Sequence, residues 1–572
     1  MVCRVVRFPL ILTSGLLVSQ FNLALRAQTS PPQPSLPLPD LTTPTRPTPI
    51  NPPLPPVPSP TAPLPLEPPT SPPSPSLPPE LESLRFPVDR IEVVGNTVLQ
   101  EEVAALVGPL EGQILSLEQL LDLRAAITAL YIDNGYITSG AFLPTGQDLS
   151  DRVVQIQVLE GEVETIQVNG LTRLSQGYIT GRLARAIQPP LNRERLEDAL
   201  RLLQIDPLLA QVNGELTAGS RPGQNLLILD VVEADATSLA LSLDNSQSVS
   251  TGSVQGEALI SHRNLLGFGD FARASYGHTE GLDRYELSYG IPLNAQDGTL
   301  QLRYENVQSR IVTSPFSDLG IRNRSQTASL YWRQPLSRSI EQEWALGLAF
   351  DLRESRSFIL NDIPFSFSEG PEEGVARVSA LRFSQEWLGR GPRRVLAARS
   401  QFSLGLDAFN ATRNDSGTDG QFLAWLGQFQ WVEQLGARWL LVSRLNTQLT
   451  GDSLLPLERF SLGGLDTVRG YSENQLVTDN AVTASMELRI PLSAQVDQLQ
   501  LTPFIEAGTG WNNRTPNPDP ATLIGLGLGL QWQPSRFTQL RLDYGLPLIG
   551  VPNQGNSLQE SGIYFSLTVW PF

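Results

Sequence analysis

The sequence predicts small α+β domains followed by a transmembrane antiparallel β-barrel of about 16 strands. Three observations lead to this prediction. Two units after the amino-terminal region share one order of strands and helices, and the pattern changes to short segments of period-two hydrophobicity after Ala234. No stretch of the 572 residues reaches the roughly 18 uninterrupted apolar residues that a membrane-spanning helix needs. A membrane protein with this pattern must therefore cross the bilayer with strands.

The first 84 residues are expected to lie outside these folded regions. Arg4 and Arg7 precede an apolar run from Phe8 to Val18, which predicts a signal peptide over residues 1–27, with a buried strand or helix as the alternative. Residues 28–84 hold 23 of the chain's 47 prolines. Because proline removes a backbone donor and fixes φ, we expect a disordered, extended spacer there. A ligand for a proline-reading domain is the alternative.

The two α+β units are predicted at residues 85–160 and 161–235. In the first, Ser116 and Gln119 are spaced to form a capping box, so a helix is expected to begin at Ser116. In the second, Leu196, Leu200 and Leu203 repeat at helical spacing. Neither unit contains a cluster of titratable residues that would suggest catalysis. Their predicted strands cover residues 88–94, 136–142, 153–158, 210–218 and 226–232, together with a first strand of the second unit that carries Ile166 and Val168.

The region from residue 236 to residue 572 alternates apolar and polar residues, as at Leu526, Leu528, Leu530 and Trp532. Such alternation gives each strand one apolar face, which both a soluble sandwich and a membrane barrel would have. The barrel is favoured because the region is about 340 residues long and aromatic residues fall at predicted strand ends. That length accommodates roughly 16 strands of ~9–11 residues with their connections.

Charge and composition exclude several classes of function. The 41 basic residues are all arginine and are outnumbered by 58 acidic residues, which argues against a nucleic-acid partner. The chain has one cysteine, Cys3, and two histidines, His262 and His278, so no metal site or cofactor is expected. Glycines 525, 527 and 529 lie within an alternating strand, where small residues facing a crowded lumen explain them better than a phosphate-binding loop. We expect no enzyme.

The two α+β units resemble POTRA domains, and the whole chain is similar to the TpsB (ShlB/FhaC/HecB-type) transporters of two-partner secretion. In the first unit the resemblance rests on the segments ITALYIDNGYITSGAFLP and EGEVETIQVNG. In the second it rests on LEDALRLLQIDPLL and on Pro222-Gly223, and at the start of the barrel on Asp244-Asn245 and Gly269-Asp270. The resemblance implies an outer-membrane barrel with its POTRA domains in the periplasm.

The most specific motif is FSLGGLDTVRGY, from Phe460 to Tyr471. In the similar family it tips an extracellular loop that folds back into the barrel. The resemblance then directs Arg469 toward an acidic residue in FIEAG, here Glu506, where the family usually has aspartate. The extra methylene leaves the bidentate geometry open, and a solvated surface loop is the alternative. The implied loop anchor consists of Gly463, Gly464, Arg469, Gly470, Tyr471, Glu506 and Gly508.

The resemblance implies transport of an unfolded, secreted β-helical exoprotein of the TpsA kind through the barrel. The exoprotein would add extended segments to a POTRA sheet edge. Outer-membrane lipid would surround the barrel, and the terminal GIYFSLTVWPF is similar to the signal read by the barrel-assembly machinery. The rivals are an assembly factor of the BamA/TamA kind, which carries three or five front domains, and a passive porin. Candidate exoprotein-binding residues are Tyr131, Gly135, Tyr136, Leu226 and Ile228.

Overall fold

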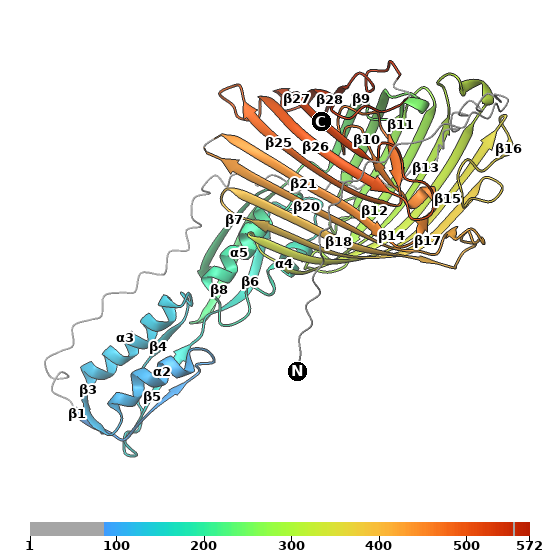
Figure 1. Cartoon of the computed structure of the whole chain (residues 1–572). Coiled ribbons are helices and arrows are strands. Elements are labelled where there is room, and N and C mark those ends of the chain that lie inside the picture. Colours follow the sequence, from blue (N-terminus) through green and yellow to red (C-terminus); the bar gives the residue numbers. More distant parts are fainter. Residues whose placement is uncertain (1–84, 437, 553–554, 572) are drawn as a thin grey trace, which may run out of the picture. The chain divides into compact units, whose positions relative to one another are not determined.

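The computed structural model describes residues 85–436, 438–552 and 555–571 (Figure 1). The predicted signal peptide and proline-rich spacer lie outside these described residues. Within the described ranges, no helix is both long and apolar enough to cross a membrane.

The first front unit contains a three-stranded sheet in the order β2-β5-β4 and a separate pair, β1 with β3. Strand β2 runs parallel to β5, and β4 runs antiparallel to it. The elements of this unit are β1 (Arg85–Val88), β2 (Arg90–Val94), α2 (Gln100–Val107), η1 (Gly108–Leu110), β3 (Gln113–Ser116), α3 (Leu117–Asp133), β4 (Gly140–Phe142) and β5 (Val153–Leu159).

The long helix of this unit begins where the sequence predicts. The Ser116 hydroxyl accepts a hydrogen bond from the Gln119 N–H, and the Gln119 side chain accepts one from the Ser116 N–H. The predicted strand over 136–142 is wrong in its first half. The Tyr136 N–H donates to the Tyr131 carbonyl in a turn that closes the helix, so only β4 is extended. The single strand predicted over 88–94 divides at Asp89 into β1 and β2.

The second front unit repeats the arrangement with the sheet order β6-β8-β7, in which β8 is central. Leu196, Leu200 and Leu203 of the predicted helix are buried against this sheet. The elements are β6 (Glu162–Asn169), α4 (Gln176–Leu183), α5 (Arg193–Gln204), β7 (Leu209–Ala218) and β8 (Gln224–Glu233).

Sixteen long antiparallel strands form a closed barrel, to which the two-residue strand β16 (Ile363–Pro364) adds a pairing with β15. The last strand pairs with the first, Val569 opposite Leu241, which confirms the predicted fold class. The long strands are β9 (Thr237–Asp244), β10 (Gln255–Arg263), β11 (Phe271–His278), β12 (Leu282–Pro292), β13 (Thr299–Arg310), β14 (Arg322–Arg338), β15 (Gln342–Ile359), β17 (Val375–Arg390), β18 (Arg394–Leu406), β20 (Leu423–Leu435), β21 (Trp439–Thr450), β25 (Asn480–Pro491), β26 (Leu499–Trp511), β27 (Thr522–Ser535), β28 (Thr538–Pro547) and β29 (Ile563–Val569).

The apolar face of the barrel strands points outward, as the alternation predicts. Leu526, Leu528 and Trp532 are exposed on β27, whereas Thr502 and Asp543 are fully buried on the neighbouring strands. A barrel wall with this polarity suits lipid outside and polar groups inside.

One long connection joins β21 to β25. Because the strands alternate in direction, it lies at the end of the barrel where β9 finishes, not where the chain enters β9. We call residues 451–479 the lumen loop. It contains β22 (Ser453–Leu454), η4 (Pro456–Glu458), β23 (Phe460–Leu462) and β24 (Leu476–Thr478). The remaining short elements are η2 (Val249–Thr251), η3 (Ser317–Leu319) and β19 (Thr418–Asp419), which pairs with β22.

Candidate functional site: a loop folded into the barrel

The lumen loop is buried along most of its length. Between Ser453 and Asn480 only the side chain of Asp466 is exposed. Strands β23 and β24 form a short hairpin, and Phe460 and Val468 pack with Leu523 of the barrel wall. The alternative of a solvated surface loop is therefore wrong for this segment.

Arg469, at the tip of the loop, lies against Glu506 of β26. One carboxylate oxygen of Glu506 accepts hydrogen bonds from Nε of Arg469 at 3.0 Å and from Nη2 at 2.5 Å. The other oxygen accepts the backbone N–H of Arg469 at 2.7 Å. The longer side chain of glutamate thus places the guanidinium on a single oxygen and leaves the second oxygen for the main chain.

Two further wall carboxylates complete the surroundings of this guanidinium. Nη1 of Arg469 lies 2.9 Å from Asp543, and Nη2 lies 3.2 Å from Glu487. The ring of Phe504 stacks beneath, with its centroid 3.4 Å from the guanidinium carbon. Arg541 and Arg489 also pair with these wall acids, so three arginines face three carboxylates.

This pairing explains why so many charges are tolerated out of water. A buried ion is costly unless it is paired and fully hydrogen-bonded, and removing one partner leaves the others uncompensated. Arg469, Glu506 and Asp543 are at most 4% exposed. We call the contacts of Arg469 with Glu506, Asp543 and Glu487 the tip anchor.

Glycines in the barrel wall make room for the tip. A Cβ at Gly525 would collide with the carbonyl oxygen of Arg469. A Cβ at Gly545 would lie 2.6 Å from the Gly470 nitrogen, and one at Gly508 would lie 2.6 Å from Leu462. The prediction that small residues on β27 face a crowded lumen is confirmed at Gly525.

The hydroxyl groups of Tyr471 and Tyr564 hold the backbone beside Arg469 in place. The Tyr471 hydroxyl contacts the backbone of Ile524 and Ile549, including their carbonyl oxygens at 3.0 and 2.9 Å. The Gly470 N–H donates to the Tyr564 hydroxyl, which in turn donates to the Tyr471 carbonyl at 2.6 Å. Gly470 has φ +106, a conformation that side chains other than glycine rarely adopt.

The remaining predicted residues, Gly463 and Gly464, shape the turn after β23. Both have positive φ, and the Gly463 N–H donates to the Thr467 hydroxyl at 2.8 Å. That hydroxyl donates back to the Gly463 carbonyl at 2.9 Å. The seven residues of the implied loop anchor are thus brought together around the tip.

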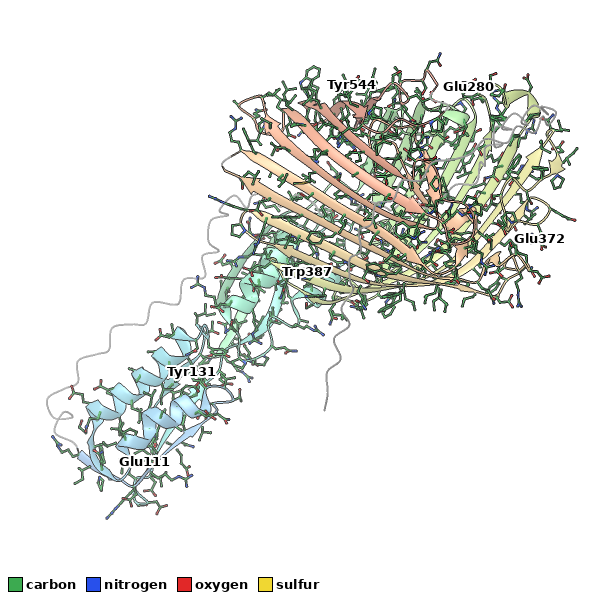
Figure 2. All side chains as sticks on the ribbon, viewed as in Figure 1. Glu111, Tyr131, Glu280, Glu372, Trp387 and Tyr544 are labelled. Atoms are coloured by element: carbon green, nitrogen blue, oxygen red, sulfur yellow. The ribbon has the colours of Figure 1, made fainter. Side chains whose placement is uncertain are left out.

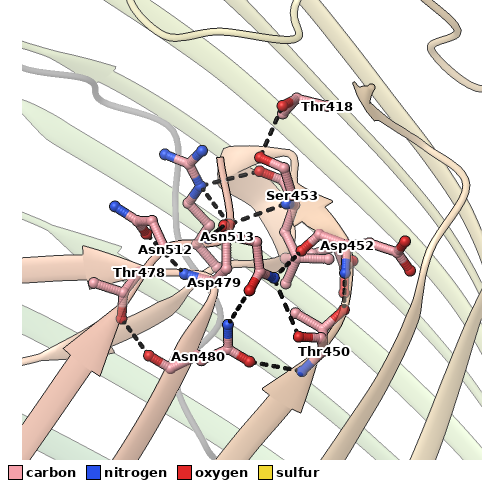
Figure 3. Close-up of polar contacts among 12 residues, drawn as sticks. Thr418, Thr450, Asp452, Ser453, Thr478, Asp479, Asn480, Asn512 and Asn513 are labelled. Carbon is pink, nitrogen blue, oxygen red and sulfur yellow. Dashed lines mark hydrogen bonds and ion pairs between the residues drawn. The ribbon is translucent and has the colours of Figure 1, made fainter. Parts of the chain in front are cut away.

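The two ends of the lumen loop meet at Asp479, which is fully buried (Figure 3). Its carboxylate accepts hydrogen bonds from the Leu454 N–H, the Arg459 Nε and the Asn513 N–H at 3.0–3.2 Å. The Asn480 side chain bridges the Thr450 N–H and the Asn513 amide. We call this group the neck of the loop.

The candidate exoprotein-binding residues do not form one surface. Tyr131 is fully buried in the first front unit, where its hydroxyl contacts Glu160 at 2.9 Å (Figure 2). Burial and that carboxylate raise the Tyr131 pKa. Gly135 has φ +86 in the turn after α3, and Tyr136 packs on the same core. A direct peptide contact by Tyr131 is contradicted by its burial.

Leu226 and Ile228 lie on β8, the central strand of the second unit. Their backbone groups already pair with β6 and β7, so they offer no free edge for strand addition. Only their side chains, on the half-exposed face of the sheet, remain accessible.

Sequence reasoning missed Asp543, Glu487, Arg541 and Tyr564. A usable signal was present, because Arg541 and Asp543 alternate with the apolar residues Leu540, Leu542 and Tyr544 of β28. Charged residues between lipid-facing positions must point into the lumen. Which strands lie beside the tip depends on the path of the loop, which alternation does not reveal. Among the described residues, no cluster of histidine, cysteine or acidic side chains could hold a metal ion.

Comparisons with known proteins agree with this architecture. The family described as "Haemolysin secretion/activation protein ShlB/FhaC/HecB" matches residues 223–532, and "POTRA domain, ShlB-type" matches residues 86–161. Outer membrane transporter CdiB of Escherichia coli O6:K15:H31 (strain 536 / UPEC) is 27% identical over 504 residues, 84% of this chain and 82% of the relative.

Two solved structures share the fold. CdiB from Escherichia coli has a TM-score of 0.64 at 23% identity and covers 87% of this chain and 92% of its own. BamA from Haemophilus ducreyi lacking POTRA domains 1–3 has a TM-score of 0.52 at 16% identity, over 85% of this chain and 99% of its own. The family match spans more than half of the chain, so the protein belongs to the ShlB/FhaC/HecB family of TpsB proteins and is an outer-membrane β-barrel transporter with periplasmic POTRA domains.

Proposed function

We propose that this transporter recognises an unfolded, secreted β-helical exoprotein through its POTRA domains and translocates it through the barrel. The observation that carries the proposal is the lumen loop, which is folded inside a closed barrel and held at its tip by ion pairs. Ion pairs can exchange partners with water or with a passing chain, whereas opening the barrel wall would break a row of backbone hydrogen bonds between two strands in lipid. The loop therefore moves aside during export, with Arg469 leaving the tip anchor.

Recognition uses the free edges of the POTRA sheets. The edges of the second sheet are β6 and β7, which are 8 and 10 residues long and pair with a strand, β8, on one side only. Added strands bind through main-chain hydrogen bonds and tolerate many sequences, as export of an unfolded chain requires. Leu226 and Ile228 contribute through the open face of β8, and Gly135 and Tyr136 shape the end of α3.

The energy for export comes from folding of the exoprotein outside the cell. The sequence contains no nucleotide-binding motif that would supply another source. Folding outside removes the unfolded chain from the lumen and prevents its return.

We assign residues 85–160 and 161–235 to the POTRA domains and residues 236–572 to the barrel. The outward apolar residues of the barrel contact outer-membrane lipid. The terminal strand β29, which closes the barrel on β9, is the signal read by the barrel-assembly machinery during biogenesis.

Two front units favour secretion over the BamA/TamA alternative, whose members carry three or five. Secretion and barrel assembly differ in which protein depends on the transporter. An assembly factor would raise the amount of other barrels in the outer membrane, and its loss would deplete them without affecting any one secreted protein.

A secretion assay tests the proposal. The full chain is expressed in a Gram-negative host together with a candidate β-helical exoprotein, chosen as a large secreted protein from a reading frame next to its gene, and the amount of that protein in the medium is measured. A chain lacking residues 88–233 is expected to insert its barrel and to export none. Undiminished export by the shortened chain would contradict recognition by the POTRA domains. Permanent high conductance, unchanged by the deletion, would favour a porin.

A further inference from the structure

The lumen loop touches two different sectors of the barrel wall. Its later part, from Phe460 to Leu476, packs with residues of β25 and β27 in the cluster around Val468. Its earlier part packs in a separate cluster against β17 and the start of β20. That second cluster consists of Leu454, Leu455 and Leu457 of the loop with Ala376, Val378, Ala380, Phe422 and Ala424.

The earlier part also carries its own buried charge, Glu458, at the end of η4. Its two carboxylate oxygens lie 2.8 and 3.0 Å from Nη2 of Arg382 on β17. Nη1 of Arg353 on β15 lies 3.0 Å from the first oxygen and also donates to the Leu457 carbonyl. Arg382 donates in turn to Asp351 at 2.5 Å. We call the contacts of Glu458 with Arg382 and Arg353 the base anchor.

The base anchor, like the tip anchor, consists of ion pairs between arginine and carboxylate side chains. Two arginines face two carboxylates, and Glu458 is 4% exposed. The sign of the loop residue is reversed, because a loop carboxylate meets wall cations here and a loop cation meets wall carboxylates at the tip. When the loop leaves the wall, Glu506, Asp543 and Glu487 at the tip and Arg382 and Arg353 at the base each lose an ion-pair partner.

The neck differs from both anchors, because the bonds of Asp479 to Leu454 and Arg459 join the two ends of the loop to each other, although Asp479 also accepts the Asn513 N–H of the β26–β27 connection. Asp479 links Leu454 and Arg459 at the start of the loop with its end, and Arg459 also donates to the Leu454 carbonyl at 3.0 Å (Figure 3). The bonds between the two ends of the loop can persist while the rest of the loop leaves the wall. The loop is thus built to move as one body about its neck.

We propose that Glu458 forms a second ion-pair anchor of the gate, and that the loop opens only when the tip anchor and the base anchor are both released. This rests on the proposed function, in which the loop is the gate for export. Either anchor alone holds the loop against one wall sector. The two anchors lie on the first arm of the loop, at Glu458, and at its tip, at Arg469, so the loop carries a buried charge at each of its two contacts with the wall.

Planar-bilayer conductance of the purified full chain, without any exoprotein, tests the base anchor. In Glu458→Gln the side chain keeps its size and loses its charge, so the fraction of time spent in the open state is expected to rise roughly tenfold. Arg469→Ala is expected to raise it as well, and the double variant to exceed either. Glu386→Gln is the matched control, because Glu386 pairs with Arg333 at 2.7 Å and also contacts Tyr331 and Arg399, all three on barrel strands.

A reversible cross-link keeps the test decisive if Glu458→Gln folds poorly. Glu458→Cys with Arg382→Cys, in a chain carrying Cys3→Ser, is joined by a short bifunctional methanethiosulfonate. The unreacted variant is expected to show raised conductance, the cross-linked form to be closed, and the reductant to restore opening. Conductance of Glu458→Gln equal to that of Glu386→Gln, or a cross-link without effect, would overturn the base anchor. Failure of the proposed function would appear instead as absent secretion by the unmodified chain.

Discussion

In the POTRA domains the fully buried side chains are mostly aliphatic, such as Ile127 and Leu227, and Asp206 is a rare buried charge there. In the barrel the arrangement is reversed. Aliphatic residues such as Leu528 face outward, and Arg469, Glu506 and Asp543 are buried in the lumen. One region is therefore stabilised by apolar packing with local caps, and the other holds a loop in place through paired charges.

The difference determines how each region responds to substitution. Loss of a charge from a buried, balanced cluster leaves its partners uncompensated, whereas loss of a cap in a small domain removes only one or two hydrogen bonds. We therefore expect large losses of stability when a substitution removes a charge from the lumen loop's contacts or adds a methyl group beside the loop. In the POTRA domains we expect small losses when a substitution removes one capping side chain. The following substitutions test this contrast, from the largest expected effect to the smallest.

Arg469→Ala should have the largest effect. It leaves Glu506, Asp543 and Glu487 as buried carboxylates with less compensation, and the cost to the loop in its closed position is about 3–5 kcal/mol. Thermal unfolding in detergent measures the loss. Arg413→Ala is the control, because Arg413 pairs with Asp407 at an exposed site. If the two variants unfolded at the same temperature, buried ion pairs in the lumen would contribute no more to stability than an exposed pair, which would contradict this account.

Gly525→Ala tests the space around the tip. Its new methyl group would collide with the Arg469 carbonyl, so we expect destabilisation of about 1–3 kcal/mol and a raised conductance. Gly256→Ala, on β10, is matched because a Cβ there meets no atom within 4 Å. If both substitutions left unfolding and conductance unchanged, close packing of the tip on β27 would be contradicted.

Glu233→Gln tests a cap in the second POTRA domain. Burial by itself raises the pKa of Glu233, but hydrogen bonds from the N–H groups of Leu174, Thr172 and Arg173 lower it to about 2. Since an unfolded glutamate has a pKa of about 4.3, the carboxylate stabilises the fold fully above about pH 5, and this contribution is lost as the pH falls toward 2.

The measurement is hydrogen exchange of these three amides in the full chain. We expect faster exchange in Glu233→Gln at pH 7, by a factor that corresponds to about 1–3 kcal/mol. The control is Glu215→Gln, at an exposed position on β7. An unchanged exchange rate would show that the carboxylate does not hold the turn.

Ser116→Ala should have the smallest effect, about 1 kcal/mol, because it removes the cap of α3. Ser175, at the start of α4, makes no side-chain capping bond, so Ser175→Ala should change less. Hydrogen exchange in the first turn of each helix compares the two. If Ser175→Ala reduced protection from hydrogen exchange more than Ser116→Ala does, the assignment of Ser116 as the cap would be contradicted.

The sequence predicts repeating features well. The alternation at Leu526 to Trp532 indicates the barrel, and the Ser116 and Gln119 pair indicates where α3 begins. Arg469 and Glu506 follow from a resemblance in FSLGGLDTVRGY and FIEAG. Each of these signals is local, or depends on a motif that can be read without knowing which strands are neighbours.

Contacts between distant segments were harder to predict. Glu458 and Arg382 are separated by 76 positions, and Arg469 and Asp543 by 74. Their pairing depends on the path of a loop with little regular structure, which periodicity does not describe. The central position of β8 was missed for a similar reason, because strand order in a sheet is set by packing and not by order in the chain.

The central claim is that the lumen loop leaves the wall during export. Leu462→Cys with Gly508→Cys, in a chain carrying Cys3→Ser, places one thiol on the loop and one on β26, where Gly508 lies against Leu462. Secretion of the exoprotein is measured with the pair oxidised and with it reduced. Export should stop in the oxidised form and return on reduction. Equal export in both forms would contradict the claim.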